Sequence, residues 1–486
     1  MNFIFLTVVY HKKGPRKWLY ISIFHRICYT SKNNKIGWCA SGRSKYRLSV
    51  TAPSADGKKE NRKVCNFMNI IDELKWRGAV NQQTDEQGLY DLVGKQSISV
   101  YCGVDPTGDS MHVGHLIPFM ILKRFQLAGH HPYMLIGGGT GSIGDPSGRK
   151  TERVLQTMDK VQHNVECLTA QLTRLFGGEE NITFVNNYDW LSKLSLLDFL
   201  RDYGKVFNIN KMLAKEVVAS RLETGISFTE FTYQILQSID FKHLHDTYGV
   251  QLQIGGADQW GNITAGIDMI HSMEGADVPV YGLTIPLMLK ADGTKFGKSA
   301  GGAVWLDPKK TSPYEFYQFW FNQDDRDVVK YLKYFTFLSH EEIDALAEEV
   351  AQHPEKREAQ RRLAEEVTRF VHGEEGLAEA QRVTQALFSG NVQELSGAEI
   401  EGAFRNTKGE TLAVVPMNIV DALVEGGVEK SKRQAREDVQ NGAIRINGEK
   451  ITDIEAQVSA HPNTNGKYVI VRKGKRNYFL LKVAQA

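Results

Sequence analysis

Apolar and polar positions near residue 100 predict a strand followed by a helix. Along residues 98–103 apolar side chains alternate with polar or small ones, the pattern of a half-buried β-strand. From residue 116 onward the apolar positions recur every three or four residues, as on one face of a helix: Leu116, Ile117, Met120, Ile121 and Phe125. A second apolar strand follows at residues 133–136. Strand, helix and strand within about forty residues is the order found in doubly wound parallel sheets, so we expect an α/β domain here.

The second half of the chain changes to helical patterning. Ser339 and Glu342 have the spacing of a capping box, which marks the start of a helix. Residues 355–388 then form a long, charged stretch with helical periodicity. We therefore expect an all-α domain over residues 312–395.

The last part of the chain predicts a small mixed domain. Glycine and asparagine in residues 396–415 are typical of a linker. Beyond it, residues 444–446 alternate apolar and basic side chains up to Asn447-Gly448, the dipeptide that most favours a hairpin turn. A short basic helix precedes this hairpin and an apolar strand follows it. We therefore expect an α+β domain over residues 416–486.

The composition is that of a soluble globular protein. The chain has 486 residues, which exceeds one ordinary core, and 42% of them are hydrophobic. No stretch reaches the roughly 18 to 20 consecutive apolar residues that a membrane span needs, so we expect no membrane partner. Beyond residue 67 the only cysteines are Cys102 and Cys167, too few for a disulfide framework or a zinc cluster. We therefore expect a reducing, cytoplasmic location and no structural metal.

The first 67 residues differ in charge from the rest. They carry 14 lysines and arginines but only two acidic residues, Asp56 and Glu60, which gives +12 within a chain whose total is +2. Three interpretations stay open: a transit peptide, a basic arm that contacts RNA, and an over-extended start of the coding sequence. We favour the last, because Met68 opens a segment whose apolar residues have helical spacing. Residues 1–67 are therefore expected to be a basic extension outside the fold.

The segment HVGH, from His112 to His115, indicates a nucleotide site. It stands between the first predicted strand and the helix that follows. The N-terminus of a helix presents unpaired N–H groups and the positive end of its dipole to an anion. Gly114 has no Cβ, so a flat base or a ribose can approach the backbone there.

A second segment, KFGKS, supplies groups suited to phosphates. Lys295, Lys298 and Ser299 offer two ammonium groups and a hydroxyl on a loop that contains glycine. The glycine-rich residues 137–148 are a weaker signal. A dinucleotide fingerprint would place its glycines between the first strand and the first helix, so a dehydrogenase is disfavoured.

Together HVGH and KFGKS resemble the two signatures of class I aminoacyl-tRNA synthetases, HIGH and KMSKS. The resemblance narrows to bacterial tyrosyl-tRNA synthetases, because five segments stand in the order and spacing of that family: YCGVDPTGDSMHVGH, GDPSGRKTER, GISFTEFTYQILQSIDF, QIGGADQWGN and ADGTKFGKS. It covers roughly residues 68–486. Val113 and the Phe-Gly pair at 296–297 depart from the general signatures but are variants that this family uses. The family often has lysine at the position of Arg149.

The resemblance implies an activity and an architecture. The expected reaction joins L-tyrosine to ATP as tyrosyl-adenylate, releases pyrophosphate, and transfers tyrosine to the 3′-terminal ribose of tRNA(Tyr). Mg²⁺ would accompany ATP. A Rossmann-like catalytic domain is expected over residues 68–311, with residues 190–250 as a connective segment through which two subunits pair as a homodimer. Residues 416–486 resemble an S4-like RNA-binding domain.

The resemblance also implies roles for individual residues. The expected catalytic residues are Thr107, His112, His115, Arg149, Arg153, Lys295, Lys298 and Ser299. The expected tyrosine-binding residues are Tyr101, Asp145, Tyr233, Gln237, Asp240 and Gln259. The expected ATP contacts are Cys102, Gly103, Asp105, His112, Gly114, His115, Gly256, Asp258 and Lys298. The spacing gives one independent support, because Tyr233, Gln237 and Asp240 would share one helical face.

Basic residues of the last domain are the candidates for tRNA contacts. They are Lys430, Lys432, Arg433, Arg436, Lys473, Lys475 and Arg476. From Pro416 to the end, 12 lysines and arginines stand against 8 acidic residues. An ordinary solvated basic face is the alternative reading.

Three other functions share part of this pattern. A tryptophanyl enzyme shares the class I site but is not expected to carry Tyr101 with Asp240 or the S4-like tail. A small nucleotidylyltransferase would not need an RNA-binding tail. A non-catalytic RNA-binding relative should have lost its phosphate-handling groups first, yet HVGH and KFGKS are complete.

Overall fold

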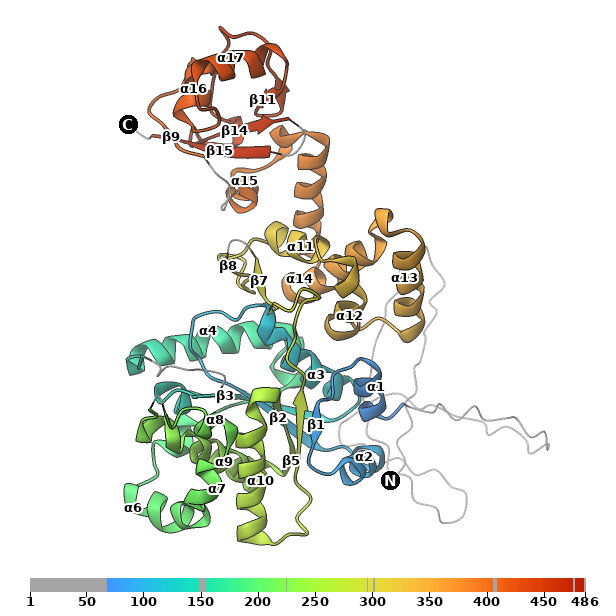
Figure 1. The fold of residues 1–486 in the computed structure, drawn as a ribbon, viewed down its shortest axis with the longest axis vertical. Helices are drawn as coiled ribbons and strands as arrows, with labels where there is room; N and C mark the ends of the chain where they lie inside the picture. The colour runs from blue at the N-terminus through green and yellow to red at the C-terminus, as the bar shows by residue number, and fades with distance from the viewer. Residues whose placement is uncertain are drawn as a thin grey trace, which may run out of the picture. The chain divides into compact units, whose positions relative to one another are not determined.

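The structure is a computed structural model (Figure 1). It describes residues 68–147, 154–223, 225–294, 296–299, 302–404, 409–474 and 477–484. The expectation for residues 1–67 therefore lies outside the described residues. Within the described part, no helix is both long enough and apolar enough to cross a membrane.

The first domain is built on a six-stranded sheet in the order β1-β6-β5-β2-β3-β4. Its strands are β1 (Gln82–Gln83), β2 (Ser99–Val104), β3 (His131–Ile136), β4 (Thr183–Asn186), β5 (Val250–Gly256) and β6 (Tyr281–Ile285). All neighbours pair in parallel except β1, which pairs antiparallel with β6. This confirms the doubly wound α/β prediction. The chain builds outward from β2 to β4 and then returns to add β5 on the other side of β2. The crevice at the carboxyl ends of β2 and β5 is therefore the expected ligand site.

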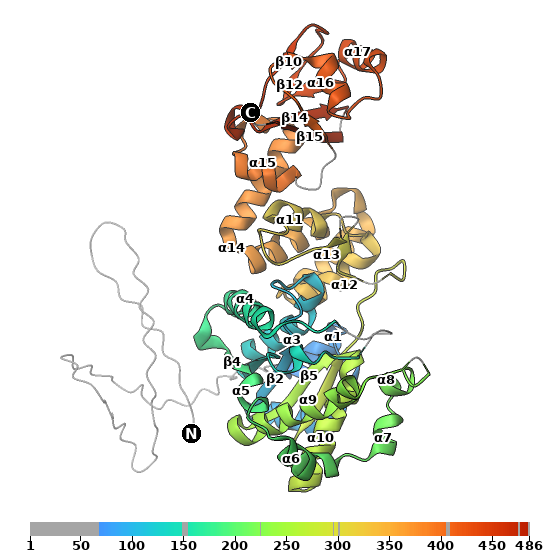
Figure 2. The same cartoon turned by 90° about the vertical axis from the view of Figure 1, so that its left-hand side faces the viewer.

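Helices cover both faces of this sheet. They are α1 (Ile70–Trp76), α2 (Glu86–Lys95), α3 (Leu116–Leu127), α4 (Met158–Phe176), α9 (Phe228–Tyr248) and α10 (Trp260–Glu274). Val100 and Cys102 point from β2 into a core that includes α3, whereas Tyr101 points into one formed with α9 and α10. The last two helices lie side by side (Figures 1 and 2). Successive residues of a strand face opposite sides of the sheet, so the position of a residue in β2 decides which of the two cores its side chain enters.

The stretch between β4 and α9 is helical, as predicted. It contains α5 (Tyr188–Leu191), α6 (Leu196–Asp198), α7 (Ile209–Leu213) and α8 (Glu216–Ala219). Several large apolar side chains in this stretch are more than half exposed: Leu196, Leu197, Leu200, Ile209, Leu222 and Phe228. Isolated exposed apolar residues are ordinary, but this number within one stretch is not.

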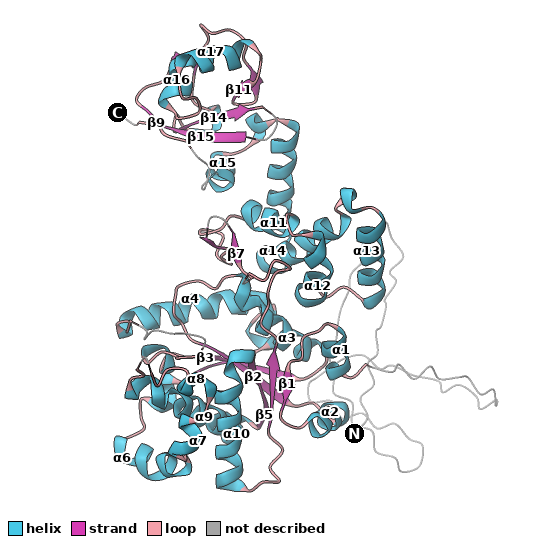
Figure 3. Ribbon diagram, in the orientation of Figure 1, coloured by secondary structure: helices cyan, strands magenta, loops and turns pink. Residues whose placement is uncertain are grey.

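Described residues from 313 to 404 form helices without strands (Figure 3). They are α11 (Pro313–Phe321), α12 (Asp325–Phe335), α13 (His340–Gln352), α14 (Glu358–Ser389) and α15 (Gly397–Phe404). The predicted capping box of Ser339 and Glu342 opens α13. Helix α14 is interrupted at Gly373, whose φ of 73° is open mainly to glycine. The long helix predicted here is therefore two helices joined at a kink.

The described part of the predicted linker, residues 396–404 and 409–415, contains a packed helix. Helix α15 lies within them and buries Ile400 and Phe404 in a cluster with Ile470 and Leu480. The hydroxyl of Ser312 donates to the carbonyl of Gly402 at 2.9 Å. The glycines that suggested a linker instead allow close packing, because a Cβ at 402 would lie 3.0 Å from the Cβ of Ser312.

The last domain is α+β, as predicted. Its main sheet has the order β12-β11-β14-β15-β9. Its elements are β9 (Thr411–Leu412), β10 (Met417–Asn418), α16 (Ile419–Glu425), α17 (Lys432–Gln440), β11 (Ile444–Ile446), β12 (Glu449–Lys450), β13 (Gln457–Val458), β14 (Tyr468–Lys473) and β15 (Asn477–Val483). Strands β11 and β12 form the hairpin expected at Asn447-Gly448, and both turn residues have positive φ, 48° and 93°.

Two buried arginines join α12 to the first domain. Arg77 donates to the carbonyls of Lys333 and Leu338 at 2.9 and 2.8 Å. Arg124 donates to the carbonyls of Lys333 and Thr336. These carbonyls lie at and just beyond the C-terminal end of α12, where the helix leaves acceptors unpaired and its dipole favours cations.

We predict that Arg124→Met destabilises the protein by about 2 to 3 kcal/mol, because buried carbonyls lose a charged donor. The thermal unfolding midpoint should fall by about 2 to 4 °C. Arg326→Met is the matched control, since Arg326 is 67% exposed and pairs only at the surface with Asp324. Equal midpoints for the two variants would contradict the assigned role of Arg124.

Candidate active site

The HVGH segment forms a capping box made of two histidines. The Nδ1 of His112 accepts from the Gly114 N–H at 3.0 Å, and the Nδ1 of His115 accepts from the His112 N–H at 3.2 Å. These contacts open the short 3₁₀ turn η1 (Val113–His115), which runs directly into α3. Burial and the neighbouring His112 lower the pKa of His115 to about 3, so that imidazole is neutral. With Nδ1 accepting, the proton of a neutral ring sits on Nε2, which becomes a donor for a ligand.

KFGKS and the strand after it lie against HVGH. The Val113 N–H donates to the Val304 carbonyl at 2.9 Å, and the Leu306 N–H donates to the Met111 carbonyl at 2.8 Å. A Cβ on Gly297 would lie 3.5 Å from the backbone nitrogen of Gly114. The two motifs, far apart in sequence, are therefore adjacent, as the predicted site requires.

Some predicted phosphate-handling residues cannot be placed. Arg149, Arg153 and Lys295 lie outside the described residues. The backbone of Lys298 and Ser299 forms strand β7 (Lys298–Ser299), which pairs with β8 (Gly302–Ala303).

A chain of hydrogen bonds connects the half-buried carboxylate of Asp105, just after β2, to the buried carboxylate of Asp240 on α9. The hydroxyl of Tyr233 donates to one oxygen of Asp105 at 2.9 Å, and Thr140 donates to the other at 2.7 Å. The Asn187 amide donates to Thr140 and to Asp240, both at 2.9 Å. Asp105 and Asp240 are therefore linked through Thr140 and Asn187.

Asp240 occupies the far end of this chain. Its second oxygen accepts from the indole N–H of Trp190 at 2.8 Å. Burial raises the pKa of Asp240 to about 7, although the hydrogen bonds from Asn187 and Trp190 act in the opposite direction. The carboxylate thus sits near the midpoint of its titration at neutral pH.

Tyr101 lies beside Asp240 with an unsatisfied hydroxyl. The residue is 1% exposed, and its OH has no hydrogen-bond partner in the described structure. Burial, followed by the charge of Asp240, raises the pKa of Tyr101 well above its usual value. A buried hydroxyl without a partner is costly, and a ligand that hydrogen-bonds it would recover that cost.

A second cluster of polar side chains surrounds Asp145. Gln259 donates to the Asp145 carboxylate at 2.8 Å, and Asn262 donates to the side-chain oxygen of Gln237 at 3.0 Å. Tyr233, Gln237 and Asp240 all lie on α9. These carboxylate, amide and phenol oxygens offer acceptors to a cation.

The remaining predicted nucleotide residues lie at the ends of two adjacent strands. Cys102, Gly103 and Asp105 come from β2 and the loop after it, in which the Thr107 N–H donates to the Asp105 carbonyl at 2.8 Å. Burial raises the pKa of the Cys102 thiol to about 12, so it is neutral. Gly256 ends β5, and Asp258 lies in the short turn η6 (Ala257–Gln259) that follows. Because β2 and β5 are neighbours, these residues border the same crevice.

Sequence reasoning missed Thr140, Asn187, Trp190 and Asn262. Asn187 directly follows β4 and is completely buried, which is unusual for asparagine. A polar residue at the carboxyl end of a parallel strand was the available signal for it. The others carry no comparable local signal.

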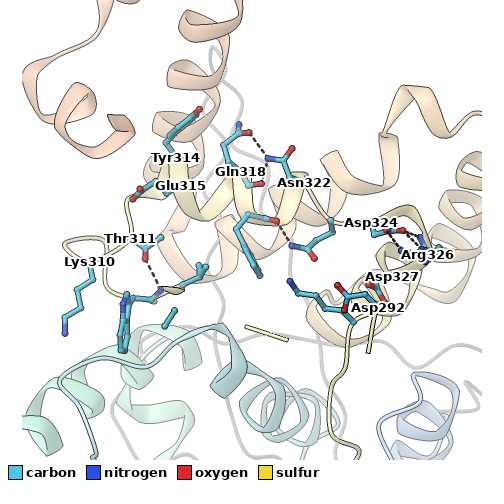
Figure 4. Close-up of a pocket in the computed structure, with 16 residues that line it drawn as sticks. Asp292, Lys310, Thr311, Tyr314, Glu315, Gln318, Asn322, Asp324, Arg326 and Asp327 are labelled. Carbon is cyan, nitrogen blue, oxygen red and sulfur yellow. Dashed lines mark hydrogen bonds and ion pairs between the residues drawn. The ribbon is translucent and has the colours of Figure 1, made fainter. Parts of the chain in front are cut away.

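A separate hollow of about 790 Å³ lies beside KFGKS (Figure 4). It opens between α11, the start of α12 and the strand that carries Trp305, and its charged lining includes Lys290, Lys310 and Arg326. Its lining shares no residue with the chain from Asp105 to Asp240. Among the described residues, no cluster of three or more His, Cys, Asp or Glu side chains could hold a metal ion.

The predicted RNA-contacting residues divide into two groups. Lys430, Arg433 and Arg436 are exposed on or beside α17, as is Lys432, which pairs with Asp421 at 2.6 Å. Lys473 instead contacts the buried carboxylate of Glu429 at 2.5 Å and that of Asp438 at 3.0 Å. Its charge is already neutralised within the domain. Lys475 and Arg476 lie outside the described residues.

Comparison with known proteins decides the family. Residues 94–389 match the family described as tRNA synthetases class I (W and Y), and residues 399–481 match the SYY-like C-terminal domain of tyrosine–tRNA ligases. The tyrosine–tRNA ligase of Levilactobacillus brevis is 70% identical over 416 residues, which is 86% of this chain and 100% of that protein. The chain belongs to the tyrosine–tRNA ligase family. The Lactiplantibacillus plantarum tyrosine–tRNA ligase is also 70% identical, over 417 residues.

A solved structure supports the same placement within the tyrosine–tRNA ligase family. The C-terminally truncated mitochondrial tyrosyl-tRNA synthetase of Aspergillus nidulans superposes with a TM-score of 0.60 at 33% identity, covering 66% of this chain and 94% of that chain. The resemblance inferred from the motifs is therefore confirmed. Neither matched family segment reaches residues 1–67.

We predict that Gly137→Ala destabilises this member of the tyrosine–tRNA ligase family by about 1 to 3 kcal/mol, the usual cost of overpacking. The new Cβ would lie 2.2 Å from an Asp105 oxygen and 2.4 Å from the Thr140 hydroxyl. Thermal unfolding measures the effect. Gly261→Ala is the control, because the nearest atom to its Cβ is 3.6 Å away, on Lys215. An unchanged midpoint for the Gly137 variant would show that the network can move aside.

Proposed function

We propose that this chain is a tyrosine–tRNA ligase (EC 6.1.1.1) that selects L-tyrosine through Tyr101 and Asp240. The observation that carries this assignment is the buried Tyr101 hydroxyl, which has no partner in the described structure, next to a buried carboxylate. The substrate phenol would accept from Tyr101 and donate to Asp240. Phenylalanine would leave the Tyr101 hydroxyl unpaired and give the buried Asp240 carboxylate no further donor, so binding the wrong substrate leaves the protein's own polar atoms unsatisfied.

The amino group of tyrosine would bind among the acceptors at the other end of α9. Asp145, Tyr233 and Gln237 supply oxygens there, and Gln259 holds the Asp145 carboxylate in place. The substrate would thus be fixed at both ends, which orients its carboxylate for reaction.

The tyrosine carboxylate then attacks the α-phosphorus of ATP. One P–O bond forms, and the bond to the departing pyrophosphate breaks. The protein supplies position and charge: His112 and His115 present Nε2–H donors, and Thr107, Arg149, Arg153, Lys295, Lys298 and Ser299 serve the phosphates. Asp258 and the close approach at Gly256 suit the ribose, while Cys102, Gly103, Asp105 and Gly114 border the nucleoside. Mg²⁺ would accompany the phosphates without a protein cage.

In the second step the 3′-terminal ribose hydroxyl of tRNA(Tyr) attacks the tyrosyl carbonyl and releases AMP. Residues 68–311 would carry the chemistry, 312–395 would face the anticodon side, and 416–486 would bind RNA. The phosphates of the tRNA would be contacted by basic side chains of this domain: Lys430, Lys432, Arg433, Arg436, Lys475 and Arg476. Such contacts add affinity more than sequence choice. Lys473 is the weakest candidate, since two carboxylates already hold it.

The enzyme is proposed to be a homodimer of the cytoplasm. The exposed apolar residues between β4 and α9, such as Leu196, Leu197 and Phe228, are 71%, 75% and 74% exposed. Burial against a second copy would remove that area from water. Cys102 and Cys167 are free thiols, consistent with a reducing compartment.

The test of this function is amino-acid-dependent ATP–pyrophosphate exchange with tyrosine, phenylalanine and tryptophan. Tyrosine alone should support rapid exchange. Tyr101→Phe should raise the tyrosine KM about tenfold, the value of one hydrogen bond, without lowering the thermal midpoint, because that hydroxyl has no partner to lose. Exchange driven by tryptophan, or an unchanged tyrosine KM in the variant, would overturn the assignment.

Tyrosine affinity should depend on pH near neutrality. The pKa of Asp240 is raised to about 7, and its ionised form is the one that accepts from the substrate phenol. Tyrosine should therefore bind most tightly above pH 7, and its Kd should rise by up to about tenfold per pH unit below it. Phenylalanine is the control ligand, since it has no hydroxyl to donate. The same pH dependence for both ligands would exclude Asp240 as the titrating group.

Charge reversal on α17 should weaken tRNA binding alone. Arg433→Glu combined with Arg436→Glu should raise the KM for tRNA(Tyr) at least about tenfold and leave pyrophosphate exchange unchanged. Lys467→Glu with Lys482→Glu makes the same charge change at two other exposed positions of the domain. Equal effects of the two pairs would indicate that the overall charge of the domain attracts the tRNA, rather than specific contacts at α17.

A further inference from the structure

The aromatic ring inside KFGKS is anchored in the all-α domain. Phe296 is only 8% exposed, although it lies between Lys295 and Lys298 in sequence. Its ring centroid lies 5.0 Å from that of Tyr331 and 5.2 Å from that of Phe335, both on α12. On α11 it lies 5.9 Å from Phe319 and 5.7 Å from Trp320. The side chain thus packs into a cage of four aromatic residues, all from the all-α domain.

The chain leading into this anchor is held by the same domain. The Ala291 N–H donates to the carboxylate of Asp327 at 2.9 Å, and Asp327 is 4% exposed. Lys330 donates to the Leu289 carbonyl at 2.5 Å. Figure 4 shows Asp292 close to Asp327 beside the hollow. Backbone contacts to α12 therefore precede the aromatic contact.

The chain leading out of the anchor is held by the first domain. Gly297 approaches the backbone of Gly114, and the extended segment after β8 hydrogen-bonds through Val304 and Leu306 to Val113 and Met111. Phe296 and Gly297 are consecutive, so the attachment passes from one domain to the other within two residues.

Helix α12 is itself fixed at its C-terminal end. Arg77 and Arg124 of the first domain bind the carbonyls at its C-terminus. The C-terminal half of α12 therefore contacts both the first domain, through these carbonyls, and Phe296 of the KFGKS segment, through Tyr331 and Phe335. A displacement of α12 would move Phe296 with it, because close-packed aromatic side chains do not slide freely.

We propose that Phe296 is a positioning residue for adenylate formation. Its ring holds the KFGKS backbone in a position set by α11 and α12. Its ring touches neither substrate. It acts by fixing the backbone from which Lys295 and Lys298 extend, and a misplacement of about 1 Å can cost about a hundredfold in rate. This role rests on the proposed function of those lysines in handling phosphate.

The test compares four variants by pre-steady-state formation of tyrosyl-adenylate and by tyrosine binding. Phe296→Ala should lower the rate of adenylate formation at least about tenfold and leave the tyrosine Kd within about twofold. Phe296→Met should recover most of the rate, because methionine fills irregular apolar space. Phe370→Ala is the matched control: it removes an aromatic ring of the same domain that packs edge-to-face on Phe337, away from Phe296. It should lower the thermal midpoint to a similar extent without the loss of rate.

A double-mutant cycle with Lys295→Ala separates positioning from general destabilisation. If Phe296 acts through the lysine, Phe296→Ala should cost little further rate once Lys295 is replaced. Additive losses, or equal losses in the Phe296 and Phe370 variants, would overturn the proposal. A Lys295→Ala variant with the normal rate would instead show that the proposed function of the lysine is wrong.

Discussion

The active-site crevice depends on one buried charge, the carboxylate of Asp240. A carboxylate away from water is expensive, and the cost is reduced here by two fixed donors, Asn187 and Trp190. Those donors come from the end of β4 and the short helix after it, whereas Asp240 comes from α9. The charge can therefore exist only when three segments of the fold are in place together, and the position of its oxygens is set by all of them.

The same chain of contacts reaches Asp105, which ties the two halves of the crevice together. Thr140 sits between the carboxylates, and its own position requires a glycine at 137, where a Cβ would collide with Asp105 and Thr140. Gly137, the first residue after β3, therefore makes room for the side chains of Asp105 and Thr140. The Tyr101 hydroxyl makes no hydrogen bond to this network. Its unpaired hydroxyl makes the free crevice slightly unstable and leaves that hydrogen bond for the ligand.

Much of the fold and part of the crevice could be predicted from the sequence. Periodicity gave β2, α3 and the helical face of α9, because these elements repeat over many residues. Asn187 and Trp190 could not be predicted, since their partner Asp240 lies about fifty residues away and only the folded sheet brings them together. Composition also misjudged residues 396–415, where glycine permits the close packing of α15. Lys473 looked like a surface cation in sequence, but Glu429 folds against it.

The joining of α12 to the first domain shows how a helical domain can influence distant chemistry. Helix ends leave carbonyls unpaired, and Arg77 and Arg124 satisfy these acceptors across the junction. Detaching α12 would remove the carbonyl acceptors of both buried guanidinium groups and leave only the carboxylate of Glu73 beside them, so the junction opposes separation of the helix from the sheet. Only an element that is held firmly can transmit a displacement from one part of the fold to another. Two of the four aromatic residues around Phe296 lie on α12, so the backbone at Phe296 and Gly297 is held by a helix that also contacts the first domain.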